Sequence, residues 1–418
     1  MSIDDTATST VPADDVPTAP SPPPADESKL SFGWIVAGLV LAALVAIVLF
    51  VTLVRVSAIG IDEYIVAPGS ATDTADAVVV SGAETFDPEA EIAFTTVTIS
   101  RSASIWEWFW AHFDDASEVV PAEDIDGTRT REETREVTQF QMNQSQDTAT
   151  LVALDLLGFE VVPEVEGAFV LQLVADSPAQ EALQLGDLIT EVDGAPVRSS
   201  EDLAEAIQSL EPGDTVEISL QRAAEDGRDG SDSSAESMEV TIRLAEHPEI
   251  EGAGFLGVSI ETPVRADAPF EVGFEVGRVR GPSAGLAFSL AIVDVLSEGE
   301  LTGGIDIATT GTIDRFGNVG AVGGVPQKIE AAHRAGIELF LVPPSELVDA
   351  VEAADGRLEV RCVQTLDDAV LVLIEFGGNG LDVLEQFGAP PLDPSPSLVD
   401  PEDGFLGCAE AEALVEAG

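Results

Sequence analysis

The sequence predicts a multi-domain α+β protein with one apolar helix near its N-terminus. Three patterns predict this class: an uncharged stretch at 32–54, alternating strand patterns at 151–245, and a strand–helix–strand pattern at 252–375. At 418 residues the chain has room for two or three domains.

The first two segments are a tail and a candidate membrane helix. Residues 1–31 are rich in Pro, Ala, Ser, Thr and Asp, a composition typical of disorder. Residues 32–55 form the predicted transmembrane helix, because 23 uncharged residues span roughly 34 Å as a helix, against about 30 Å of hydrocarbon. A cleaved signal peptide is the alternative, although its apolar core would usually be only about 7–15 residues long. The flanking Lys29 and Arg55 balance each other, so charge does not orient the helix.

Composition excludes some partners. The chain has 77 acidic and 18 basic residues, a net charge of −59, so nucleic acid and anionic membrane surfaces are unfavourable partners. Its two cysteines, Cys362 and Cys408, have no metal-site spacing, and no metal site is predicted. Whether they form a disulfide stays open, because the sequence supplies no geometry.

Residues 56–150 are predicted to be a β-rich, membrane-proximal region. This region contains two strand patterns, "DAVVVSG" and "FTTVTIS", followed by an aromatic helical stretch, "IWEWFWAHF". Trp106, Trp108 and Trp110 in that stretch have two open interpretations. They lie at a membrane interface, where indole rings are favoured, or they belong to a packed helix.

Residues 151–245 show an ordered series of strands and turns. "GAFVLQLV" alternates as a strand, "LGDLITEVDGAPV" reads as two strands around an Asp193–Gly194 turn, and "SSEDLAEAIQSL" has helical spacing. This series resembles a bacterial PDZ domain. The resemblance implies binding of peptide C-termini, with "LLGF" as the carboxylate-binding loop formed by Leu157, Gly158 and Phe159. A glycine turn before a strand is the alternative for these three residues.

The block at 252–375 holds the candidate chemistry. In "GPSAG", Ser283 is either a helix N-cap or a nucleophile whose small neighbours leave room for a carbonyl substrate. Lys328 is the only lysine after residue 29. In an apolar pocket its pKa would fall, and the neutral amine could accept the serine proton. The three histidines lie in unrelated contexts, so a Ser–Lys dyad is favoured over a Ser–His–Asp triad.

No phosphate-binding loop accompanies the glycines around Lys328. A P-loop needs Gly-Lys followed by Ser or Thr, whereas this lysine lies between Gln327 and Ile329. No ATPase module is therefore expected, and no cofactor is predicted.

"GPSAG" together with "GNVGAVGGVPQKIEAAHRAG" resembles the proteolytic domain of Lon proteases. The resemblance covers 252–375 and implies an α/β proteolytic domain in which Ser283 is the nucleophile and Lys328 the general base. It also implies that Thr310 of "TGTI" hydrogen-bonds the lysine. With the apolar helix and the PDZ-like block, the chain resembles membrane-anchored, PDZ-containing Lon-like proteases of Gram-positive bacteria. That group implies a cytoplasmic tail at 1–31, extracytoplasmic PDZ and protease domains, and a homo-oligomer, with a hexamer common for Lon.

The predicted function is a single-pass membrane serine endopeptidase that works without ATP on unfolded, exported or membrane-linked polypeptides. The lipid bilayer is a partner through residues 32–54, and residues 376–418 are expected to be a flexible acidic tail. The alternative is a non-catalytic PDZ adaptor whose Lon-like domain only binds. An ATP-dependent protease would require a separate ATPase partner.

Overall fold

The computed structural model describes residues 32–57, 63–114, 116–127, 129–165, 167–222, 236–277, 279–393 and 407–417. The chain divides into two compact units, with the boundary between Ile59 and Gly60. Residues 1–31, which were expected to be disordered, lie outside the described residues.

The first unit contains one helix, α1 (Phe32–Ser57), where the sequence predicts a helix at 32–55. Its described side chains, at 36–48, are all exposed. Among the residues that the structure describes, no helix meets the length and hydropathy of a membrane-crossing segment.

The second unit is built around a mixed six-stranded sheet. Its order is β20-β19-β16-β3-β1-β4, with β20, β19, β16 and β3 parallel and β1 antiparallel to both of its neighbours. The strands are β1 (Glu63–Asp73), β3 (Ile92–Ser100), β4 (Glu118–Pro121), β16 (Ile307–Thr309), β19 (Leu339–Val342) and β20 (Glu359–Cys362).

This sheet changes the predicted domain organisation. Residues 56–150 were expected to form a region of their own, but β1, β3 and β4 supply half of the sheet that carries the 252–375 block. A further pair, β2 (Val78–Ser81) with β15 (Glu271–Phe274), joins the same two parts of the chain. Pairing between strands about 200 residues apart leaves no trace in a local sequence pattern.

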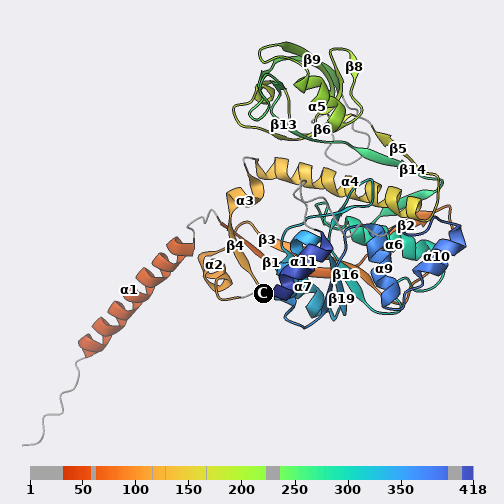
Figure 1. The fold of residues 1–418 in the computed structure, drawn as a ribbon. Coiled ribbons are helices and arrows are strands. Elements are labelled where there is room, and N and C mark those ends of the chain that lie inside the picture. Colours follow the sequence, from red (N-terminus) through yellow and green to blue (C-terminus); the bar gives the residue numbers. More distant parts are fainter. Residues whose placement is uncertain are drawn as a thin grey trace, which may run out of the picture. The chain divides into compact units, whose positions relative to one another are not determined.

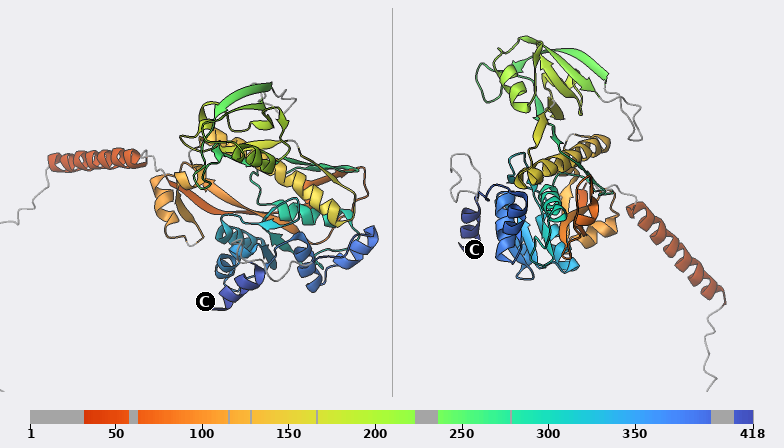
Figure 2. Two further views of the ribbon diagram at one scale, coloured as in Figure 1. Left: turned by 45° about the horizontal axis from the view of Figure 1, so that its top comes forward. Right: turned by 90° about the vertical axis from the view of Figure 1, so that its right-hand side faces the viewer.

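Helices cover both faces of the sheet, as Figure 1 and Figure 2 show. Strand residues alternate between two hydrophobic cores: Phe94 packs with α6 and α4, whereas the preceding Ala93 packs with α7 and α8. The helices of this unit, apart from those described below, are α2 (Ile105–Ala111), α3 (Ala122–Asp126), α4 (Arg131–Leu156), α6 (Gly285–Leu296), α7 (Val325–Ala335), α8 (Leu347–Ala354) and α9 (Leu366–Glu375).

The PDZ-like block is an insertion into this fold. β5 (Val162–Val165) leads into it and β14 (Val264–Asp267) leads out, and the two pair antiparallel. Between them lies a second sheet, ordered β10-β9-β7-β6-β13, with its own core. Its elements are β6 (Ala168–Leu173), η2 (Pro178–Glu181), β7 (Leu188–Val192), β8 (Ala195–Pro196), α5 (Ser200–Gln208), β9 (Thr215–Arg222), β10 (Glu236–Arg243), β11 (Ala245–Glu246), β12 (Gly254–Phe255) and β13 (Val258–Glu261). The predicted turn is present, since Asp193 and Gly194 both have positive φ.

The C-terminal part differs from the expected flexible tail. α10 (Gly380–Phe387) buries Val383 and Leu384 in the core beneath α6, because its apolar residues share one helix face. α11 (Cys408–Ala417) packs against α8. A disulfide between Cys362 and Cys408, with an S–S distance of 2.05 Å, joins α11 to the edge strand β20. The open question about the cysteines is thus answered by the fold, which brings β20 and α11 together.

Candidate active site

Ser283 lies in the turn that precedes α6. The residue at the N-cap is Ala284, and no side chain caps this helix, so the structure rules out the N-cap interpretation of Ser283. Gly285 begins α6 where a Cβ atom would lie 2.9 Å from the backbone nitrogen of Ile313. Gly285 therefore allows α6 to approach the hairpin that contains β17 (Thr312–Ile313) closely, directly after the serine turn.

Lys328 lies in the first turn of α7. The helix starts after Gly324, which has a left-handed conformation, and the Lys328 N–H donates to the Gly324 carbonyl oxygen. The side chain turns inward and is only 3% exposed. Its Nζ donates a hydrogen bond to Thr310 Oγ1 at 2.9 Å.

Thr310 connects the lysine to the serine turn. It follows β16 and is fully buried. Its Oγ1 accepts from Lys328 and donates to the carbonyl oxygen of Ser283 at 3.3 Å, and the N–H of Gly311 donates to the same carbonyl at 3.1 Å. The sequence-predicted trio Ser283, Lys328 and Thr310 is therefore brought together in one place.

The environment of Lys328 changes its acidity. Burial, which disfavours the charged ammonium, lowers the pKa of Lys328 from 10.5 to about 8, and the negative charge of Glu346 opposes this effect. Glu346 also accepts a hydrogen bond from the N–H of Val322, in the loop before α7. At pH 7 about one tenth of the Lys328 amines are then neutral, compared with roughly one in 3,000 for a lysine with a pKa of 10.5.

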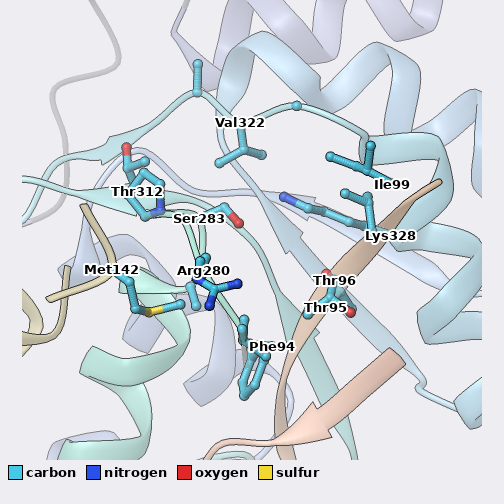
Figure 3. Close-up of a pocket in the computed structure, with 17 residues that line it drawn as sticks. Phe94, Thr95, Thr96, Ile99, Met142, Arg280, Ser283, Thr312, Val322 and Lys328 are labelled. Atoms are coloured by element: carbon cyan, nitrogen blue, oxygen red, sulfur yellow. The ribbon is translucent and has the colours of Figure 1, made fainter. Parts of the chain in front are cut away.

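A pocket of about 730 Å³ opens beside these residues. Figure 3 shows the side chains of Ser283 and Lys328 pointing toward one another inside it, with Arg280 beside the serine and Val322 above. No hydrogen bond joins Ser283 Oγ to Lys328 Nζ among the described contacts. In enzymes, hydrogen bonds between a nucleophile and its base are often long without substrate and shorten when substrate binds.

The charge of the pocket is opposite to that of the chain. Arg280 and Lys328 are the charged side chains among the described residues that line it, and none of those residues is acidic. This contrasts with 77 acidic residues against 18 basic ones overall. Arg280 was not among the predicted site residues, although its position three residues before Ser283 was a usable signal.

One wall of the pocket is an unpaired stretch of sheet edge. β16 pairs with β3 only over 92–94, whereas the wall of the pocket includes Thr95, Thr96, Val97 and Ile99 of β3. The opposite edge of β3 is occupied by β1. β3 thus extends past the end of its pairing with β16 along the wall of the pocket.

The predicted peptide-binding loop of the PDZ-like block has a different role. Leu157 is 1% exposed and belongs to the core of the first sheet, and Phe159 contacts the rings of Phe270 and Phe387. The N–H groups of Leu157, Gly158 and Phe159 donate to carbonyls in the last turn of α4. These donors close a helix and are not available to a carboxylate, so the assignment from "LLGF" is wrong.

A second, similar motif lies at the edge of the PDZ-like sheet. "FLGV" at 255–258 leads into β13, the outer strand next to β6. α5 runs beside it: Gly254 approaches the Ile207 carbonyl at the C-terminal end of α5, and Thr262 hydrogen-bonds Ser200 at the N-terminal end. The Leu-Gly-apolar pattern of 157–159 occurs again at 256–258, and this repeat was the sequence signal that could have indicated the edge strand.

Comparison with known families agrees with this division. Residues 277–375 match the Lon protease (S16) C-terminal proteolytic domain, and residues 156–241 match the PDZ domain. The chain carries a serine endopeptidase domain of the Lon type and a PDZ domain. The Lon match begins after the PDZ insertion, so it does not include β1, β3 and β4, which complete the sheet.

Individual relatives match part of the chain. An archaeal Lon protease from Methanocaldococcus jannaschii is 38% identical over 103 residues, which are 25% of this chain and 15% of that protein. The Lon protease of Haemophilus influenzae is 29% identical over 138 residues, 32% of this chain and 17% of that protein. The chain thus spans less than a fifth of the length of these relatives. A solved PDZ domain of an SdrC-like protein from Listeria monocytogenes is 29% identical, with 23% of this chain and 87% of that chain covered and a TM-score of 0.18.

Proposed function

We propose that this protein is a membrane-anchored serine endopeptidase that cleaves unfolded, exported or membrane-linked polypeptides without ATP. The observation that carries the proposal is the buried Lys328, whose Nζ is bonded to Thr310 beside Ser283 in an open pocket. A lysine held in this way can be neutral near physiological pH, which is the property that a general base requires.

In the proposed reaction Ser283 Oγ attacks the peptide carbonyl while neutral Lys328 accepts the hydroxyl proton. Thr310 positions the amine, since it holds Nζ by a hydrogen bond and is itself fixed to the Ser283 carbonyl. The oxyanion forms at the start of α6, where backbone N–H groups and the helix dipole stabilise negative charge. The resulting ammonium then protonates the leaving amine, and a water molecule hydrolyses the acyl-enzyme.

The substrate chain is proposed to bind as an added strand along β3. An extended peptide paired with residues 95–99 would pass between Ser283 and the loop that contains Val322. Folded substrates offer no free strand, so the arrangement favours unfolded polypeptides.

The PDZ domain is proposed to bind C-termini of substrates or regulators. The outer strand β13 and the helix α5 are the elements that support this assignment. An extended C-terminus would add to β13, with its carboxylate near Leu256 and Gly257.

The anchor is proposed to be α1. The 23 uncharged residues at 32–54 and the exposure of the side chains at 36–48 support it. The same proposal places the PDZ and protease domains outside the cytoplasm, with the bilayer as a partner of residues 32–54. It also includes a homo-oligomer, since Lon proteolytic domains commonly form hexamers. These points rest on family resemblance.

The test is cleavage of an unfolded, casein-like polypeptide by the full chain in lipid vesicles, without ATP. Ser283→Ala and Lys328→Ala should each lose activity. His333→Ala is the matched control, because His333 is exposed on the same helix as Lys328 and should keep full activity. If Ser283→Ala cleaves as well as the parent, Ser283 is not the nucleophile.

A parent chain that binds the polypeptide but never cleaves it would favour the alternative, a non-catalytic PDZ adaptor. Cleavage that appears only after an ATPase is added would identify a separate ATPase partner.

A further inference from the structure

The short helix α2 and the turn that follows it carry exposed aromatic side chains, which we call the aromatic stripe: Trp106, Phe109, Trp110 and Phe113. Their exposed fractions are 50%, 44%, 65% and 68%. The spacing i, i+3, i+4 places Trp106, Phe109 and Trp110 on one side of the helix. Phe113 lies two residues past the end of α2, where its ring contacts those of Phe109 and Trp110. Such a stripe normally faces a protein core, so its exposure calls for a partner that covers it.

The aromatic rings of the stripe pack against one another. The ring centroids of Phe109 and Phe113 are 5.1 Å apart, and those of Phe109 and Trp110 are 5.7 Å apart. A capping box at Ser104 and Glu107 fixes the start of the helix.

The other side of α2 is fastened to the protein. Ala111 is buried, and Trp108 is partly buried, with its Nε1 donating a hydrogen bond to Glu63. Glu63 is the first residue of β1, and five residues along the chain separate it from Ser57, the last residue of α1. The hydrogen bond of Trp108 therefore fastens α2 to the first residue of β1, which is close to α1 along the chain.

We propose that the aromatic stripe inserts into the headgroup region of the bilayer that holds α1. This inference rests on the proposed membrane anchor, since an inserted α1 would bring Glu63, and α2 with it, to the bilayer surface. Trp and Phe suit that depth, because their rings are apolar and the indole N–H can still reach water or headgroups. The stripe contains no charge, and the acidic chain around it favours a zwitterionic over an anionic surface.

A second copy of the chain is the alternative partner that could cover the aromatic stripe. Few exposed apolar side chains of such a copy could contact it. Outside α1 and the stripe, the large exposed apolar residues of the described chain come one from each element or loop. They are Val79, Val174, Ile250, Phe316, Val348, Leu381 and Leu414. With α1 in the bilayer, the stripe of a second copy is the set of large exposed apolar side chains on one short segment that could face this stripe.

The experiment measures quenching of tryptophan fluorescence by brominated phosphatidylcholine, with the full chain in vesicles. Trp34→Phe removes the indole of the apolar helix, which leaves Trp106, Trp108 and Trp110. The matched control adds Trp106→Phe and Trp110→Phe, so that only Trp108, bonded to Glu63, reports. We expect about twofold quenching of the stripe tryptophans and little quenching of Trp108.

Sedimentation with the vesicles separates the two proposals. A chain that does not sediment contradicts the anchor. A chain that sediments while its stripe tryptophans stay unquenched overturns the inference about the stripe and leaves the anchor in place. Disulfide cross-links between copies carrying Phe113→Cys, without quenching, would show that a second copy covers the stripe and would also overturn the inference.

Discussion

Replacing Lys328 by Met should make the protein inactive but more stable at neutral pH. In the folded chain burial lowers the pKa of Lys328 from 10.5 to about 8, which means that folding costs free energy whenever the amine is charged. At about 1.4 kcal/mol for each tenfold change, this difference amounts to roughly 3 kcal/mol. Met has a similar length and no charge, but it loses the hydrogen bond to Thr310, worth about 1 kcal/mol. The variant should therefore be more stable by about 2 kcal/mol at pH 7.

The pH dependence gives the sign of the effect. Below pH 8 the lysine is charged in both the folded and the unfolded chain, and the full cost is present. Between pH 8 and 10.5 only the unfolded chain binds the proton, so the parent gains stability as the pH rises. The advantage of the Met variant should then disappear toward pH 10.5.

The assay is urea unfolding of the parent and of Lys328→Met at pH 7 and pH 10. Arg334→Met is the matched control, because Arg334 lies on the same helix in an exposed pair with Glu330 and should change stability by less than about 0.5 kcal/mol. If Lys328→Met is less stable at pH 7, or if its difference from the parent is the same at both pH values, burial does not lower the lysine pKa as argued.

Three further predictions concern the site and its support. Thr310→Val should lower kcat/KM about 10- to 100-fold by releasing the Lys328 amine, whereas Thr310→Ser should retain most activity; equal rates for both variants would contradict the positioning role. Arg280→Gln should slow cleavage of peptides with an acidic residue beside the scissile bond roughly three- to tenfold and leave neutral peptides unchanged, with Arg315→Gln as a control outside the pocket; an unchanged acidic-to-neutral ratio would refute it. Cys408→Ser should lower the free energy of unfolding by roughly 2–4 kcal/mol, because the bond closes a separation of 46 residues; a variant as stable as the parent in urea would show that α11 needs no disulfide to stay packed.

Several features of the fold could be predicted from short windows of sequence. The buried helix after Ser283 is α6, in which every residue is buried, and Gly336 ends α7 in a left-handed conformation. The trio of Ser283, Lys328 and Thr310 was named from its motifs, and the fold places the lysine amine on the threonine hydroxyl. For the helix and the glycine the physical cause is local, namely helical periodicity and a positive φ, whereas the role of Thr310 came from the resemblance to Lon proteases.

Other features could not be predicted because they depend on contacts between distant segments. "LLGF" and "FLGV" have similar sequences. The N–H groups of the first donate to carbonyls at the end of α4, whereas the second leads into the outer strand β13. The sequence of either motif does not indicate whether its backbone N–H groups are already hydrogen-bonded within the fold.

The sequence by itself determined many of the local elements that this chain forms and named Ser283, Lys328 and Thr310 as candidates, since helices, turns and motifs depend on neighbours within a few positions. The tertiary structure decided which segments complete the protease sheet, how deeply Lys328 is buried and that Arg280 lines the pocket. β16 pairs Ala308 with Ala93 across more than 200 residues. Such pairings depend on the whole packed chain, because they require segments that are distant in sequence to pack against each other. The burial that lowers the pKa of Lys328 depends on the same packing, which excludes water from the amine.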